Sequence, residues 1–142
     1  MSGSYVLVGA YASLARNNGI ALYGSAESLR ELASVIRAGG LTDIGLSAPP
    51  DDALEVAPLR GIRVLTGDRE PVELRAIGEV IEMAGGSDAL NKLAATFENL
   101  AAAPELGGLV PRHVDLEYFP GHGFLGEGSV WMTVTLLSFL SP

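Results

Sequence analysis

The chain has 142 residues, no cysteine, and 17 acidic against 9 basic residues, which gives a formal net charge of −8. This length suits one ordinary domain, and the lack of cysteine excludes disulfide frameworks, thiol catalysis and cysteine-based metal sites. The acidic charge disfavours binding to nucleic acid or to anionic membranes, and favours a basic protein partner. Residues 71–142 hold 3 basic and 9 acidic residues, against 6 and 8 in residues 1–70, so the second half carries most of this charge.

The first predicted elements are two strands, YVLVGAYA at residues 5–12 and GIALYG at residues 19–24. The start of the chain lacks the basic segment that a secretory signal requires, and the apolar run at residues 130–140 is too short to cross a bilayer. We therefore expect a cytoplasmic protein without a membrane segment.

Two helices follow from apolar residues spaced at i, i+3, i+4 and i+7. We expect Ser25 to cap the first helix and Gly39 to end it, and Ser87 to cap the second, which Pro104 closes. The apolar positions are Leu29, Leu32, Ala33 and Ile36 in the first helix and Leu90, Leu93, Ala94 and Phe97 in the second.

Further strands are predicted on both sides of the second helix. They are DIGLSAPP (43–50), IRVLTG (62–67), PVELRAI (71–77), EVIEMAG (79–85), HVDLEYFP (113–120) and VWMTVTLL (130–137). The proline-rich residues 46–61 are expected to form a loop, and TGDREP at residues 66–71 the boundary between two halves.

The order of elements repeats along the chain. GSAESLRELASVI from Gly24 matches GGSDALNKLAATF from Gly85 at an offset of 61 residues, and Ile62 and Val64 fall on Met132 and Val134 at an offset of 70. We interpret this as a tandem duplication of a strand–helix–strand–strand unit.

The predicted fold class is α+β, with about eight short strands in a mostly antiparallel sheet and two helices on one face. We expect one domain over residues 1–142, made of units at 1–69 and 70–142 that lie side by side and share a continuous sheet.

One predicted strand carries the main candidate for a site. His113, Asp115 and Glu117 alternate with apolar residues and so share one strand face. With His122 they could bind a metal and serve a metal-dependent enzyme, but a solvated sheet face explains the same alternation. Ser129 lies outside any nucleophile elbow, and the glycine-rich turn before it lacks the ending of a phosphate-binding loop. We therefore predict no catalytic residue, no metal and no cofactor.

Four of the nine aromatic residues, Tyr118, Phe119, Phe124 and Trp131, lie close together in the sequence. Aromatic side chains beside acidic residues can form a recognition surface, although they also fill cores. Phe119 and Phe124, which flank the turn, are the better candidates for contact with a partner.

The segments IEMAGGSDALNKLAATFENLA and HVDLEYFPGHGFLGEGSVWMTV resemble the bacterial immunity protein 32 family of polymorphic toxin systems. The resemblance covers residues 72–140, and the first half looks like a degenerate copy that lacks the histidine, the aromatic residues and the Gly-Ser step. It implies a small intracellular antidote that binds a toxin without catalysis.

The binding surface would centre on the strand and turn from His113 to Ser129, and the partner would be a basic toxin domain. A structural oligomerisation module remains an alternative, and the chain could be a monomer or a homodimer. The residues predicted to contact the partner are His113, Asp115, Glu117, Phe119, His122, Phe124 and Glu127.

Overall fold

The computed structural model describes residues 5–15, 18–48, 57–102 and 112–137. These residues form two helices and ten strands, which confirms the α+β class. The strands of the first half are β1 (Tyr5–Leu7), β2 (Ala10–Leu14), β3 (Ile20–Ser25), β4 (Leu41–Leu46), β5 (Ala57–Leu59) and β6 (Gly61–Thr66). Those of the second half are β7 (Glu73–Ile77), β8 (Val80–Gly85), β9 (His113–Leu116) and β10 (Met132–Leu137); the helices are α1 (Ala26–Ala38) and α2 (Ser87–Ala101).

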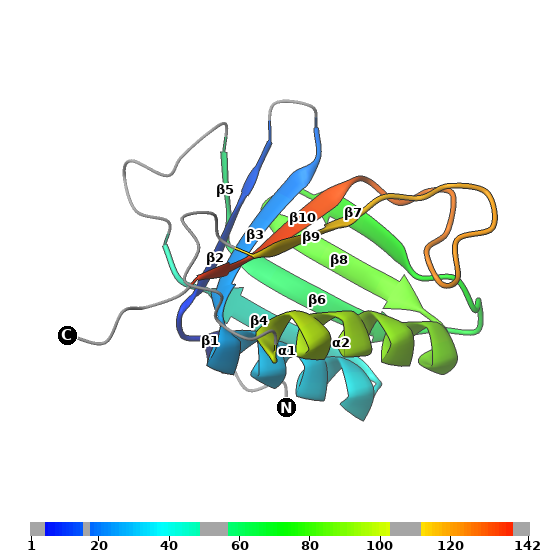
Figure 1. Cartoon of the computed structure of the whole chain (residues 1–142), viewed down its shortest axis with the longest axis horizontal. Coiled ribbons are helices and arrows are strands. Elements are labelled where there is room, and N and C mark those ends of the chain that lie inside the picture. Colours follow the sequence, from blue (N-terminus) through cyan, green and yellow to red (C-terminus); the bar gives the residue numbers. More distant parts are fainter. Residues whose placement is uncertain (1–4, 16–17, 49–56, 103–111, 138–142) are drawn as a thin grey trace.

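The strands form two five-stranded sheets instead of the expected continuous one (Figure 1). Sheet A has the order β1-β4-β6-β8-β7, and sheet B has the order β5-β2-β3-β10-β9. Neighbours within a hairpin are antiparallel, as predicted, but β1 and β4, β3 and β10, and β6 and β8 pair in parallel. Both sheets are therefore mixed.

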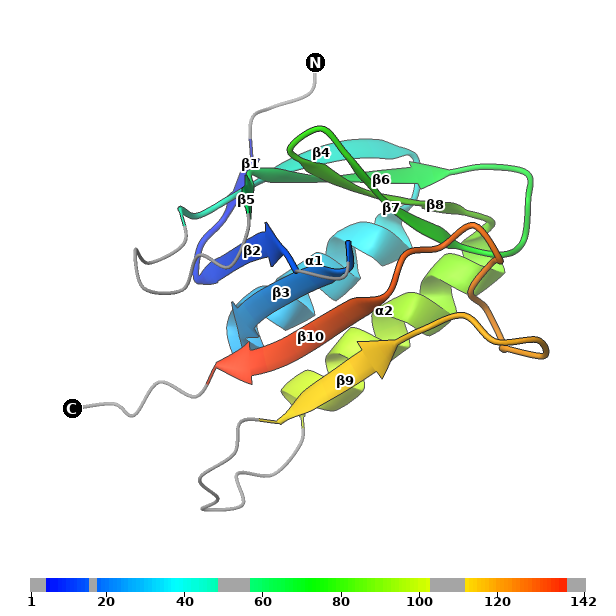
Figure 2. The same cartoon turned by 90° about the horizontal axis from the view of Figure 1, so that it is seen from above.

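Each sheet combines strands from both halves of the chain. The hairpin β7–β8 of the second half extends the first-half strands β4 and β6, and the hairpin β2–β3 of the first half extends β9 and β10. The two halves thus interleave, and do not lie side by side as separate units. In Figure 1 the helix pair lies below the strands, and seen from above (Figure 2) strands of sheet B pass in front of the helices while sheet A runs along one side of them.

The helices lie side by side and run in opposite directions (Figures 1 and 2). All eight apolar positions predicted from the helical spacing are buried, and they belong to one hydrophobic cluster with residues of both sheets. Side chains such as Ile20, Met132, Ile62 and Ile81 supply the sheet side of this core.

The helix caps follow the sequence at α1 but not at α2. The Ser25 hydroxyl accepts a hydrogen bond from the Ser28 backbone N–H at 3.1 Å, and Gly39 ends α1, as expected. The prediction that Ser87 caps α2 is wrong, because Gly86 is the cap residue and no side chain caps the helix. Pro104, predicted to close α2, lies outside the described residues.

Two further differences concern short strands. The strand predicted at residues 5–12 is broken at Gly9, whose φ of 86° lets the chain turn between β1 and β2. Part of the loop predicted at residues 46–61 forms β5, which pairs with β2, while residues 49–56 lie outside the described residues.

The parallel pairings repeat at the offsets found in the sequence. Ile20 lies opposite Met132, and Ile81 lies opposite Ile62. Adding 61 residues takes Ile20 to Ile81, and subtracting 70 takes Met132 to Ile62. This coincidence agrees with the duplication, which stays a prediction.

Among the helices in the described part of the chain, none has the length and apolar character needed to cross a membrane.

Candidate partner-binding surface

Strand β9 lies at the end of sheet B (Figure 2). Its polar side chains are exposed to solvent. His113 and Asp115 are exposed, whereas Leu116 is buried and Val114 packs against the core. The Asp115 carboxylate accepts a hydrogen bond from the Thr133 hydroxyl of β10 at 2.8 Å. Glu117 follows the end of the strand and is also exposed. The alternation in the sequence thus corresponds to one buried and one solvated face.

A tight turn follows β9. The His122 N–H donates to the Phe119 carbonyl at 2.9 Å, and Gly121, two positions after Phe119, has a φ of 88°. Pro120 and Gly121 therefore occupy the positions that a type II turn favours for proline and glycine. This turn places the His122 side chain next to the backbone of Phe124 and Leu125.

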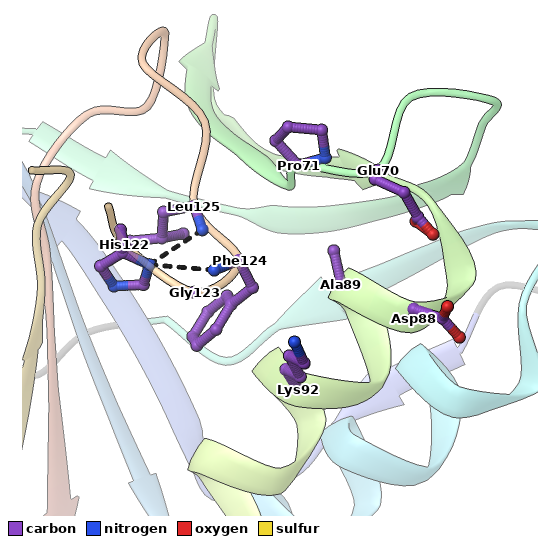
Figure 3. Close-up of a pocket in the computed structure, with 9 residues that line it drawn as sticks. All are labelled: Glu70, Pro71, Asp88, Ala89, Lys92, His122, Gly123, Phe124 and Leu125. Carbon is purple, nitrogen blue, oxygen red and sulfur yellow. Dashed lines mark hydrogen bonds between the residues drawn. The ribbon is translucent and has the colours of Figure 1, made fainter. Parts of the chain in front are cut away.

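His122 organises the loop by accepting two hydrogen bonds from the backbone (Figure 3). Its Nδ1 atom lies 3.2 Å from the Phe124 nitrogen and 3.0 Å from the Leu125 nitrogen, and both N–H groups donate to it. The imidazole ring also contacts Phe119 and Phe124 edge to face, with centroids 4.9 and 4.7 Å away. The structure thus brings together three of the residues predicted to contact a partner, Phe119, His122 and Phe124.

The two phenylalanines of this cluster differ in exposure. Phe119 is 57% exposed, whereas Phe124 is partly buried against the core. Of the other aromatic residues, Trp131 is 39% exposed and Tyr118 packs against the core. Phe119 and Trp131 therefore offer more aromatic surface to a partner than Phe124 and Tyr118 do.

The loop from Phe124 to Val130, which leads into β10 of sheet B, forms hydrogen bonds with the backbone at the start of β7 in sheet A. Val72 donates to the Phe124 carbonyl and accepts from the Gly126 N–H, and Val130 donates to the Leu74 carbonyl. The Ser129 hydroxyl accepts from the Leu74 N–H at 3.0 Å and donates to the Val72 carbonyl at 3.2 Å. Ser129 thus has a structural role, since both hydrogen bonds of its side chain are with the backbone at the start of β7.

Two pockets flank Pro71 where this loop meets the segment before β7. One has a volume of about 290 Å³ and is lined by His122, Phe124 and Leu125 together with Glu70, Asp88 and Lys92 (Figure 3). The other, of about 280 Å³, is lined by Glu127 with Asp68, Glu73 and Arg69. Sequence reasoning missed Glu70, Asp88 and Lys92, because only the packing of α2 against the loop brings them together.

The alternative of a metal site is not supported by the geometry. His122 directs Nδ1 to the backbone, and the parts of the chain that the structure describes contain no group of three or more His, Cys, Asp or Glu residues able to hold a metal ion. His113 and Asp115 instead lie on the solvated side of β9, and Glu117 follows the end of that strand.

A second aromatic feature lies on sheet B and was not predicted as part of the site. The rings of Tyr11 and Tyr23 stack with centroids 4.9 Å apart and an interplanar angle of 18°. Tyr23 lies opposite Thr135, which lies opposite His113, so the strand register places the stack on the same sheet face as His113 and Asp115. The alternation of polar and apolar residues predicts on which face of the sheet each residue lies. It does not predict which strands become neighbours.

The comparison with known protein families bears on this surface. Residues 80–136 match the model of the immunity protein 32 family. The match runs from β8 through α2, β9 and the turn into β10, so the resemblance predicted for residues 72–140 is confirmed over this range. The predicted degenerate copy in the first half is not part of the match. Neither the curated proteins nor the solved structures contain a match to this chain.

Proposed function

We propose that this protein is an immunity protein that neutralises a bacterial toxin by binding it directly, without catalysing a reaction. The observation that carries the proposal is the family match over residues 80–136, which includes all seven residues predicted to contact a partner. The absence of cysteine fits a protein of the cytoplasm, where we expect it to act.

The charge of this region supports a basic partner. Residues 112–137 contain three carboxylates, on Asp115, Glu117 and Glu127, and one permanently basic side chain, on Arg112. All three carboxylate residues are exposed. Such a surface attracts a basic toxin domain, speeds its association at low ionic strength and loses this advantage as salt increases.

Two exposed aromatic residues in the same region are candidates for apolar contact with a partner. Phe119 projects at the turn, and Trp131 lies directly before β10. Large aromatic side chains at the centre of an interface often supply much of its binding energy, while surrounding charges guide orientation. We therefore propose a surface in which Phe119 and Trp131 make apolar contacts and the three carboxylates contact basic side chains.

The proposal is tested by growth protection. Each gene that flanks this one in its source genome is expressed from an inducible promoter in a laboratory bacterium, with and without the present protein. We expect one neighbour to stop growth, the present protein to restore it, and the two proteins to purify as a salt-sensitive complex. A toxic neighbour that the protein neither binds nor neutralises would contradict the proposal.

Matched charge reversals locate the surface. Asp115→Lys, Glu117→Lys and Glu127→Lys should each weaken toxin binding by about tenfold or more, as expected for charge pairs at an interface. Glu31→Lys, which reverses a carboxylate on α1, is the control and should bind as the wild type does. Equal thermal unfolding curves for all four variants show that the loss concerns binding and not folding.

A further inference from the structure

Within the part of the chain that the structure describes, no neighbouring strand uses the backbone groups on the outer edge of β9. β9 is paired with β10 on one side only and is the last strand of sheet B. The Leu136 N–H donates to the Arg112 carbonyl at 2.8 Å, which makes Arg112 and Leu136 a hydrogen-bonded pair. Such pairs alternate in an antiparallel ladder. The N–H and C=O groups of His113 and Asp115 therefore point away from β10.

Of the three other edge strands in the described residues, β1 has only three residues, and β7 and β5 are partly protected. The start of β7 is covered by the loop that bonds to Val72 and Leu74, and β5 contains Pro58 in its three residues. Proline and lysine are common means of protecting an edge strand, and β9 has neither. Its sequence, HVDL, places a carboxylate at the middle of the edge.

We propose that β9 accepts an added strand from a basic protein. Main-chain hydrogen bonds from the incoming strand would pair with His113 and Asp115, and its lysine or arginine side chains would lie beside Asp115 and Glu117. A second copy of this chain is a poorer occupant, because a central Asp115 would meet another acidic edge. The inference rests on the proposed function for the identity of the partner, but its chemistry can be tested without the toxin.

The test uses the full chain and a capped peptide of about eight residues that alternates lysine and valine, which is long enough for one strand. Amide hydrogen exchange is followed residue by residue by NMR. We expect saturating peptide to slow exchange at His113 and Asp115 by about tenfold, with little change at Val114, whose N–H already faces β10. A peptide that alternates glutamate and valine should have no effect.

A pair of variants separates the backbone from the carboxylate. Asp115→Ala removes the charge and keeps the outward N–H, and should weaken binding of the lysine peptide by no more than about fivefold. Asp115→Pro also removes the N–H, which the β9–β10 ladder does not use, and should abolish binding. Circular dichroism checks that both variants fold. If Asp115→Pro does not fold, the exchange pattern of the wild type with the lysine peptide still tests whether a strand is added at β9.

Several outcomes would overturn the inference. Equal losses in the two variants would show a side-chain contact without strand addition, and protection confined to other strands would place the peptide elsewhere. Protection at His113 and Asp115 that grows with protein concentration and without peptide would make a second copy the occupant. If the growth assay succeeds while β9 shows no protection, the protein is an antidote that does not use this edge.

Discussion

Arg37 on α1 and Glu98 on α2 form an ion pair that joins the two helices, with an Nη2–Oε1 distance of 2.6 Å. The two residues are 61 positions apart, which is also the offset at which the helix sequences match. The pair therefore links corresponding positions of the two predicted units.

This ion pair predicts a dependence of stability on pH. Hydrogen bonding from Arg37 lowers the pKa of the Glu98 carboxyl from its ordinary value of 4.5. Ionised Glu98 thus stabilises the fold above about pH 4.5, and this contribution is lost as the pH falls through the lowered folded-state pKa. The effect should be modest because both side chains are well exposed.

Urea unfolding of the wild type and of Glu98→Gln between pH 3 and neutrality measures this contribution. The wild type should be the more stable protein near neutral pH, and the difference should shrink in acid. Glu79→Gln is the control, because Glu79 also pairs with an arginine, Arg60, but those two side chains are more exposed than Arg37 and Glu98, so this substitution should change stability less. A difference that grows in acid would contradict the account of the ion pair.

Ser129 is predicted to stabilise the contact between the two sheets. Ser129→Ala leaves the Leu74 N–H without its acceptor and should lower the free energy of unfolding by about 1–3 kcal/mol. Ser87→Ala provides the matched control, since Ser87 is exposed and caps no helix end, and should change stability by less than about 0.5 kcal/mol. Chemical denaturation measures both changes. A larger loss of stability in Ser87→Ala than in Ser129→Ala would contradict the roles given to the two serines.

Gly85 is predicted to tolerate no side chain. A Cβ atom there would lie 2.7 Å from the Val72 Cα and 2.8 Å from the Pro71 carbonyl oxygen, and both are backbone atoms that cannot move alone. Gly85→Ala should therefore cost about 1–3 kcal/mol or more. Gly67→Ala, at a position with no atom within 4 Å of the added Cβ, should be close to neutral in the same thermal unfolding assay.

The repeated glycine of the sequence gains a physical explanation from these contacts. Gly24, which matches Gly85, is also closely packed, because a Cβ there would lie 2.8 Å from the Ser28 hydroxyl oxygen. The helices and their buried faces could be predicted because periodicity and the Ser25 cap are local features. The two sheets could not, since the choice of β10 as the neighbour of β3 depends on packing across the whole chain.

The candidate site was likewise predictable only in part. Alternation placed His113, Asp115 and Glu117 on a solvated face, and the glycines indicated a turn. Nothing local indicated that His122 would accept hydrogen bonds from Phe124 and Leu125, or that Ser129 would bond to another sheet. Those contacts form only when the loop folds back on itself and meets β7.

The interleaved halves give a test of the duplication. A fragment of residues 70–142 lacks β3 and β6, the parallel neighbours of β10 and β8. If the halves are duplicated, β8 of one fragment can pair with β10 of another, so the fragment should fold only as a dimer. Sedimentation and circular dichroism over a range of concentrations check this, and a folded monomer or a chain that stays unfolded would count against it.

In the proposed function, the protein neutralises a toxin by binding it through the region from β9 to the turn. The most direct measurement is hydrogen exchange of the protein, followed by mass spectrometry, with and without the toxin identified by growth protection. We expect slower exchange in peptides that cover residues 112–129. Exchange should be unchanged in peptides that cover the strands of sheet A. Protection of sheet A with no change in residues 112–129 would contradict the claim.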